Sequence, residues 1–163
     1  MNAVLTDYEQ SILDNVDRNG CHITMVFDPE KQQPNFAYSV GFPETVGQPE
    51  VIVFGLSQEM MGFMINQTLR RCRAGMRLAE GVEIDGLLQG HVCVAREVSP
   101  ENIEREFFNS AMWFQRHRSG TDMAEAYQIV WPGAVDGLFP WEDGCAEIVR
   151  EIQPALYERR LNS

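Results

Sequence analysis

The chain has 163 residues, of which 44% are hydrophobic and 23% charged, and its formal net charge at pH 7 is -11. This length and composition predict one globular domain over residues 1–163, large enough to bury its own core. The negative charge argues against nucleic acid and anionic membrane surfaces as partners, because both present negative phosphates. The sequence contains no run of ~18 apolar residues, so we do not expect a membrane-spanning helix.

The cysteines indicate the compartment. The sequence contains four of them, and none has the CxxC spacing of a redox or zinc motif. The first residues lack the basic start and the apolar centre of a signal peptide. We therefore expect a cytoplasmic protein in which the four thiols are free. They are Cys21, Cys72, Cys93 and Cys145.

The first half of the chain predicts a helix followed by three strands. Thr6 and Glu9 have the spacing of a capping box, and Gly20 can end a helix, so a helix is expected over 7–19. The segment 51–56 is a continuous apolar run, which is typical of a strand covered on both faces. Strands are expected over 21–27, 36–42 and 51–56, with the first two paired as a hairpin.

Two further helices are predicted in the middle of the chain. Ser57 can cap a helix whose apolar positions, within 61–76, would face the core. The sequence Ser99-Pro100-Glu101 is a helix start, with a capping residue, a proline in the first turn and an acid near the positive end of the helix. This helix is expected to reach about Arg118, with a break near Asn109.

The remaining segments complete the predicted fold. Asp85-Gly86 is a turn signal between two strands. Short connections between successive strands favour antiparallel pairing. The sequence thus predicts a single α+β domain, with a mixed, mostly antiparallel sheet packed with about four helices. The other expected elements are strands over 81–84, 91–98 and 126–131, and a helical segment over 146–161 that is interrupted by Pro154.

Several short motifs occur in a specific order along the chain. They are Phe36-Ala-Tyr-Ser-Val-Gly-Phe42, Gly47-Gln-Pro-Glu50, Val53-Phe-Gly-Leu56, Ala111-Met-Trp-Phe-Gln-Arg116, Gln128-Ile-Val-Trp-Pro132, Gly137-Leu-Phe-Pro-Trp141 and Gln153-Pro154. Through these motifs the chain resembles the bacterial domain of unknown function family four-two-six-two over nearly its whole length. This resemblance classifies the chain but implies no activity, cofactor or site residue. Cys21 and Ser39 replace the Trp and Thr expected of the family, and Gly133 replaces an acid that the family often has.

The sequence contains no decisive catalytic motif. His91 and Cys93 are two residues apart on an expected strand, but a structural zinc site needs four ligands, so no metal site is predicted. Ser39 lies in Tyr-Ser-Val-Gly, which is not the Gly-x-Ser-x-Gly nucleophile elbow. The helix start after Gly55 could present amide groups to an anion, but Glu59 would oppose the anion.

The segment 127–141 concentrates large aromatic residues. Trp131 ends a strand and is predicted to be core, whereas Trp141 follows a proline in a loop and is predicted to belong to a site with Arg116. The competing interpretation is that both tryptophans fill the core and Arg116 pairs with an acid. The candidate cofactor-binding residues, which together could line a pocket for a planar or anionic ligand such as a flavin, are Tyr38, Trp113, Arg116 and Trp141.

Two functions from different classes remain open. The first is a soluble, non-catalytic binding protein, such as an acidic inhibitor or immunity-type partner of a basic protein. The acidity, the small size and the lack of a reactive centre favour it. The second is a small enzyme or planar-cofactor binder that uses the aromatic and arginine pocket. Neither hypothesis identifies the partner or the ligand.

Overall fold

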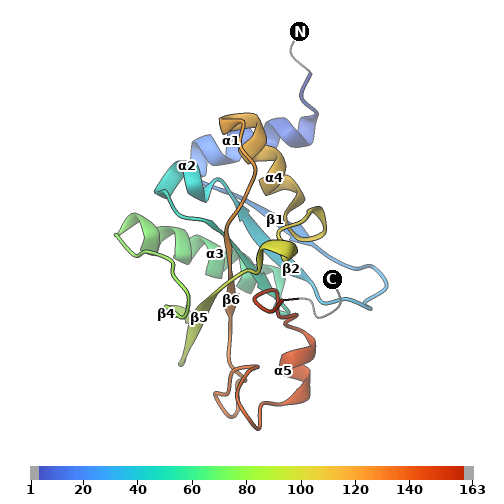
Figure 1. The fold of residues 1–163 in the computed structure, drawn as a ribbon, viewed down its shortest axis with the longest axis vertical. Helices are drawn as coiled ribbons and strands as arrows, with labels where there is room; N and C mark the ends of the chain where they lie inside the picture. The colour runs from blue at the N-terminus through green and yellow to red at the C-terminus, as the bar shows by residue number, and fades with distance from the viewer. Residues whose placement is uncertain (1–3, 160–163) are drawn as a thin grey trace.

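A computed structural model describes residues 4–159, which fold around a six-stranded sheet (Figure 1). The strand order is β1-β2-β3-β6-β5-β4. β3 and β6 run parallel, and every other neighbouring pair is antiparallel. The predicted α+β fold with a mixed, mostly antiparallel sheet is confirmed. The strands are β1 (His22–Val26), β2 (Phe36–Val40), β3 (Glu50–Phe54), β4 (Glu83–Leu88), β5 (His91–Glu97) and β6 (Ala126–Val130).

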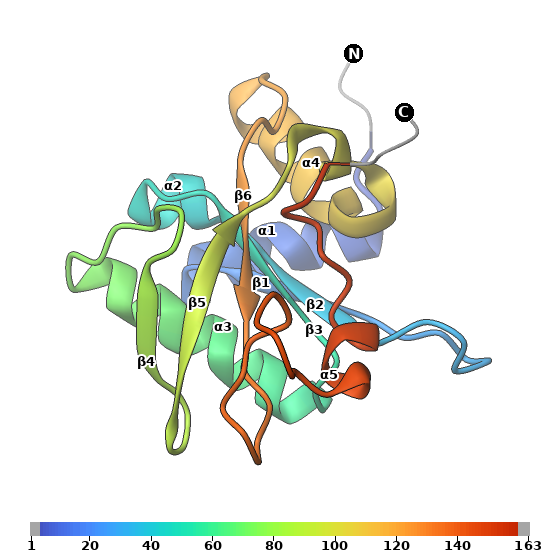
Figure 2. The same cartoon turned by 60° about the horizontal axis from the view of Figure 1, so that its bottom comes forward.

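Helices cover both faces of the sheet (Figures 1 and 2). Val51 and Val53 of β3 pack with the core on the α3 face, whereas Ile52 and Phe54 pack with the core on the face of α1 and α4. All four side chains are buried, so the predicted strand with two covered faces is confirmed. The helices are α1 (Asp7–Asn19), α2 (Phe42–Val46), α3 (Gln58–Arg73), the 3-10 helix η1 (Pro100–Asn102), α4 (Arg105–Ser119) and α5 (Glu147–Glu151).

The helix starts predicted at Thr6 and Ser57 form as their capping residues indicate, whereas the Ser99 hydroxyl makes no capping hydrogen bond and precedes only η1. In α1, the Thr6 hydroxyl accepts a hydrogen bond from Glu9 N at 3.0 Å, and Glu9 Oε1 accepts one from Thr6 N at 2.9 Å. Gly20 then ends the helix with φ +93°, a conformation that a side chain would disfavour. In α3, the Ser57 hydroxyl accepts a hydrogen bond from Met60 N at 3.1 Å.

The expected break near Asn109 is also confirmed. The chain forms η1 directly after Ser99 and starts α4 at Arg105. Phe108, with φ -138° and ψ 25°, is non-helical inside α4. The break turns Phe108 into the core, where its side chain is completely buried.

Some local predictions are wrong. Asp85-Gly86 does not form a turn but lies inside β4, and the chain turns at 89–90. The register between β4 and β5 shifts between Ile84 and Leu88, so Gly86, at φ +78°, belongs to an irregularity of the strand. Of the helical segment predicted over 146–161, the described residues form only α5, and residues 160–161 lie outside the described part of the chain. The sequence also did not predict α2, a five-residue helix that Gly47 ends.

Trp131 occupies the core, as predicted. It is 7% exposed, and its indole N–H donates to Phe54 O at 2.8 Å. The side-chain amide of Gln153 pairs with the backbone of Trp131, accepting from its N–H at 3.0 Å and donating to its C=O at 2.9 Å. The segment 132–146 therefore leaves the end of β6 from a fixed point and forms the loops at the bottom of Figure 1.

The C-terminal segment is held by side-chain amides of other elements. Gln128 of β6 donates to Pro154 O at 2.9 Å and accepts from Leu156 N at 3.0 Å. Asn102 donates to Leu156 O at 2.8 Å and to Glu158 O at 3.1 Å. Both amide side chains are buried, and they give the segment hydrogen bonds that a neighbouring strand would otherwise provide.

Candidate functional site

The predicted site residue Tyr38 lies in the core. It is 2% exposed, its ring packs against Phe108 with the ring centres 5.8 Å apart, and its hydroxyl accepts a hydrogen bond from Ser110 N at 2.9 Å. The ring and the hydroxyl are thus both engaged in joining β2 to α4. This position differs from the pocket wall that the sequence predicted.

Trp141 lies in the loops beyond β6, where it contacts other aromatic rings. Its ring is stacked on Phe139, with the ring centres 5.0 Å apart and the planes 4° from parallel. The guanidinium carbon of Arg96 lies 4.4 Å from the centre of the Trp141 ring and 4.2 Å from that of Tyr157. Arg96 also donates to Glu80 Oε1 at 2.8 Å. We call Phe139, Trp141, Arg96 and Tyr157 the aromatic ladder, which joins the C-terminal segment to β5.

Trp113 and Arg116 do share a hollow, which has a volume of about 380 Å³. Trp113 is half-buried, and its ring is stacked on His117 with the ring centres 5.0 Å apart. Arg116 forms an exposed ion pair with Asp122 at 3.2 Å. The structure thus distributes the four predicted residues over three places. The α4 hollow is lined by Arg105, Asn109, Met112, Trp113, Arg116, Asp122 and Met123.

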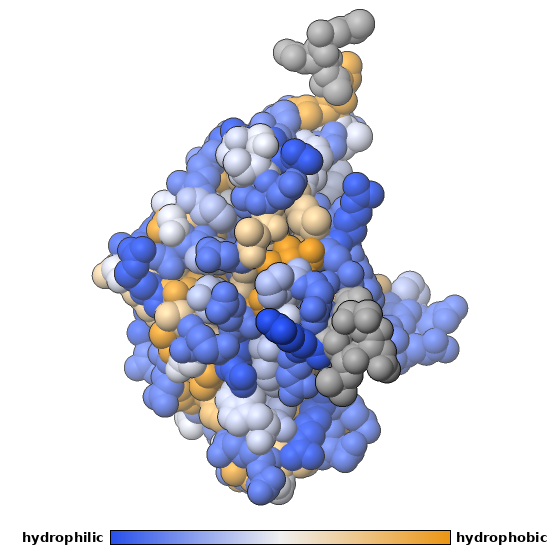
Figure 3. Space-filling view, in the orientation of Figure 1, coloured by the Kyte–Doolittle hydropathy of each residue, from blue (hydrophilic) through white to orange (hydrophobic). Residues whose placement is uncertain are grey.

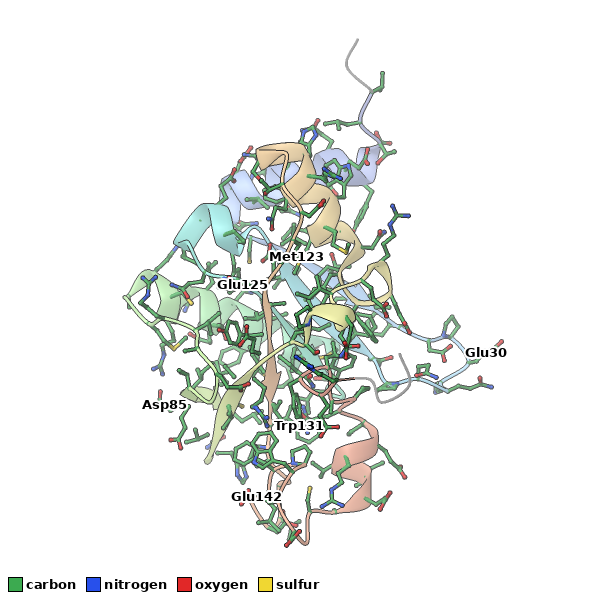
Figure 4. All side chains as sticks on the ribbon, viewed as in Figure 1. Glu30, Asp85, Met123, Glu125, Trp131 and Glu142 are labelled. Atoms are coloured by element: carbon green, nitrogen blue, oxygen red, sulfur yellow. The ribbon has the colours of Figure 1, made fainter. Side chains whose placement is uncertain are left out.

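A second depression, the α2–α4 groove, collects acidic residues. It consists of two hollows of about 320 Å³ and 370 Å³ that share Pro43 and Gln115 as lining residues. One wall comes from α2 and the loop into β3, and the other from the end of α4 and its connection to β6, where Figure 4 labels Met123 and Glu125. Arg118 is the one basic residue among the described lining residues. The carboxylates are those of Glu44, Glu50, Asp122 and Glu125.

Glu50 is the most unusual of these acids because it is 2% exposed. Its Oε1 accepts hydrogen bonds from the Ser39 hydroxyl at 2.7 Å and from Phe42 N at 3.1 Å. Its Oε2 accepts one from Gly41 N at 2.7 Å. Gly41 has φ +107°, a left-handed conformation that few other residues adopt, and this turn directs two backbone N–H groups at the carboxyl.

The environment of Glu50 has opposing effects on its pKa. Burial raises the pKa and the hydrogen bonds from Gly41, Ser39 and Phe42 lower it, and the net effect raises the pKa to about 7. The carboxyl therefore changes charge near neutral pH. A group with this property beside a groove can act as a counter-charge for a cation or exchange a proton with a bound molecule.

The thiols are poorly suited to nucleophilic chemistry. All four cysteines are free and buried. Burial raises the pKa of Cys21 and of Cys93 to about 12 and that of Cys72 to about 11, so these three remain protonated at neutral pH. Within residues 4–159, no group of three or more potential metal ligands is found, and no helix has the length and hydropathy needed to cross a membrane.

Several residues of the two depressions escaped the sequence analysis. Glu50 appeared only within the Gly47-Gln-Pro-Glu50 motif, although an acid that opens a buried apolar strand is a signal of its own. Arg118 joins three helices by contacting Asp17 of α1 at 2.7 Å and Glu44 of α2 at 2.8 Å. Arg105 lines the α4 hollow with Asn109 and Met112 of its own helix, so its position on α4 was an available signal.

The face in Figure 3 is mostly hydrophilic, with an apolar patch at its centre, where Figure 4 labels Met123.

No curated protein and no solved structure matches the chain. The model of one protein family, described as a domain of unknown function (DUF4262), matches residues 15–146. This match includes β1 to β6, Glu50 and the residues that line both depressions, so the chain belongs to the DUF4262 family.

Proposed function

We propose that the protein is a non-catalytic binding protein whose α2–α4 groove receives a basic segment of another protein. An inhibitor or an immunity-type protein acts in this way. The observation that carries the proposal is the gathering of four carboxylates around one groove that contains a single arginine. Acidic grooves attract lysine and arginine side chains and raise the rate at which basic partners associate.

The surroundings of Arg118 strengthen this proposal. Its guanidinium group is engaged in two ion pairs, with Asp17 and Glu44, at the junction of three helices, so its charge repels a cationic ligand less. Asp122 and Glu125, by contrast, lie on the exposed rim. Apolar surface from Pro43 and Phe114 lines the groove between the charges. This combination suits a long basic side chain, whose methylene stem packs on apolar surface while its charged end meets a carboxylate.

We also place the protein in the cytoplasm of a bacterium. The four buried, unpaired thiols support this placement, since a reducing compartment keeps thiols in this state. The net charge of -11 supports a basic protein as the partner, because long-range attraction acts before any contact forms.

Calorimetric titration with a hexa-arginine peptide tests the groove. We expect the double variant Asp122→Asn with Glu125→Gln to lower affinity about tenfold at ~0.15 M salt, as loss of two rim charges implies. The matched control is Asp143→Asn with Glu151→Gln, which removes the same charge from exposed positions in and near α5. The control should retain affinity within about twofold. Equal losses in the two variants would show attraction by net charge alone and would refute a groove.

A further inference from the structure

The α4 hollow differs from the groove in the sign of its charge. Arg105 and Arg116 of α4 contribute two guanidinium groups, and Asp122 contributes the one carboxylate. Within residues 4–159, the side chain of Arg105 forms no hydrogen bond or ion pair. Arg116 pairs with Asp122 at 3.2 Å, but the two side chains are 64% and 79% exposed, so the pair is weak. Both arginines are therefore available to an anion.

The rest of the hollow is aromatic and polarisable. Trp113 is half-buried between the two arginines along α4, and Met112 and Met123 add thioether groups. Methionine side chains adapt to flat apolar ligands, and arginine stacks on aromatic planes as well as binding carboxylates. The volume of about 380 Å³ lies within the range of small-molecule sites.

We propose that the α4 hollow binds a small planar aromatic carboxylate. The ligand carboxylate pairs with the guanidinium groups of Arg105 and Arg116, and its ring lies against Trp113 and the methionines. Both guanidinium groups line the hollow, so they can give charge and direction to the contact. The aromatic surface selects planar ligands over saturated ones.

Asp122 connects this site to the α2–α4 groove, because it lines both. An anion that binds Arg116 competes with Asp122 for the same guanidinium. Once released, the Asp122 carboxylate adds negative charge to the groove. A bound aromatic carboxylate should thus raise the affinity of the groove for a cation, and a cation in the groove should raise the affinity of the hollow for the anion to the same extent.

The probe for this site is 2-naphthoate, titrated into the full-length protein by calorimetry. Two comparison probes separate charge from shape: cyclohexanecarboxylate is an anion without a planar ring, and 2-naphthylmethylammonium has a planar ring and a positive charge. We expect 2-naphthoate to bind at least about fivefold more tightly than either comparison probe. Equal binding of all three probes would refute the proposal.

Variants then locate the site. Arg105→Gln and Arg116→Gln should each weaken 2-naphthoate binding at least about fivefold, and both positions are exposed, so folding is retained. Arg70→Gln is the matched control on α3 and should change affinity by less than about twofold. A loss as large in the Arg70 variant would refute the assignment to this hollow.

Asp122→Asn gives the sharpest outcome, because the change in affinity is expected to have opposite signs at the two sites. It should raise the affinity for 2-naphthoate roughly threefold, since it removes the competing carboxylate. The same variant should lower the affinity for hexa-arginine in the groove. A loss of 2-naphthoate affinity would refute the proposed site in the α4 hollow but not the proposed groove. Unchanged hexa-arginine binding would count only against the groove.

Discussion

Two charged side chains near the same end of the sheet are held in different ways, since the end of β5 and the start of β3 both lie beside the start of β6. Where β5 leads into the aromatic ladder, Arg96 lies against Trp141 and Tyr157 and is paired with Glu80. Where β3 begins, Glu50 is held by a hydroxyl and two backbone N–H groups. Glu50 forms no ion pair within the described part of the chain. A paired charge anchors structure, while a charge held by neutral donors stays available to a proton or a cation.

Replacing Trp131, which follows the other end of β6, should lower the stability of the fold the most. Trp131→Ala removes a buried indole and its hydrogen bond to Phe54, so we expect a loss of ~3–5 kcal/mol in the free energy of unfolding. Trp141→Ala is the control, because Trp141 is 42% exposed and should cost less than half as much. Urea denaturation measures both. Equal losses would mean that the ladder is as central to the fold as Trp131.

Glu50 should make stability depend on pH. Its raised pKa means that the folded protein binds the proton more tightly than the unfolded chain does. The resulting stability is complete below the unfolded pKa of 4.5 and is lost as the pH rises through about 7. The full change is on the order of 3 kcal/mol, and Glu50→Gln should abolish it.

The measurement for Glu50 is urea denaturation at intervals from about pH 4.5 to about pH 8. The exposed Glu83→Gln variant should follow the wild-type pH profile. If the difference in stability between wild type and Glu50→Gln did not change over this interval, the carboxyl would not titrate there, and its hydrogen bonds would outweigh its burial.

Much of the fold could be predicted because its signals are local. The capping box of α1 and the apolar run of β3 each depend on neighbouring residues in the sequence. The strand irregularity at Gly86 could not be predicted, since glycine serves in turns and in bulges alike. The site was predicted in part: Trp113 and Arg116 are about one helical turn apart and line the same hollow, but the positions of Tyr38 and Trp141 depend on tertiary packing. The position of Glu50 at the start of a buried strand was a signal in the sequence, but its hydrogen bonds from the turn at Gly41 depend on tertiary structure.

Replacing Arg96 should lower stability less, and the loss tests whether the paired arginine anchors the aromatic ladder. Arg96→Lys keeps the positive charge but loses the planar group that lies against Trp141 and Tyr157, so we expect a loss of about 1 kcal/mol in stability. Quenching of tryptophan fluorescence by acrylamide should rise as the ladder loosens. Lys should rescue part of the loss seen in Arg96→Ala. Equal effects of the two variants would argue that the ring contacts are unimportant.

Arg118 should give the smallest change in stability. Its ion pairs with Asp17 and Glu44 are partly exposed, so Arg118→Gln should cost less than ~1 kcal/mol. The same variant should bind hexa-arginine more tightly, because the Glu44 carboxylate then becomes available to the ligand. Weaker binding would show that Arg118 takes part in recognition.

The amides of Gln128 and Asn102 have a consequence for how the C-terminal segment can vary. They contact the backbone of residues 154–158 rather than its side chains. A backbone contact does not depend on which side chain the residue carries. Positions such as Ala155 and Glu158 should therefore tolerate exchange, while replacing Gln128, whose side chain is completely buried, should release the segment. The residues that fix the position of this segment thus lie mostly outside it, in β6 and in η1.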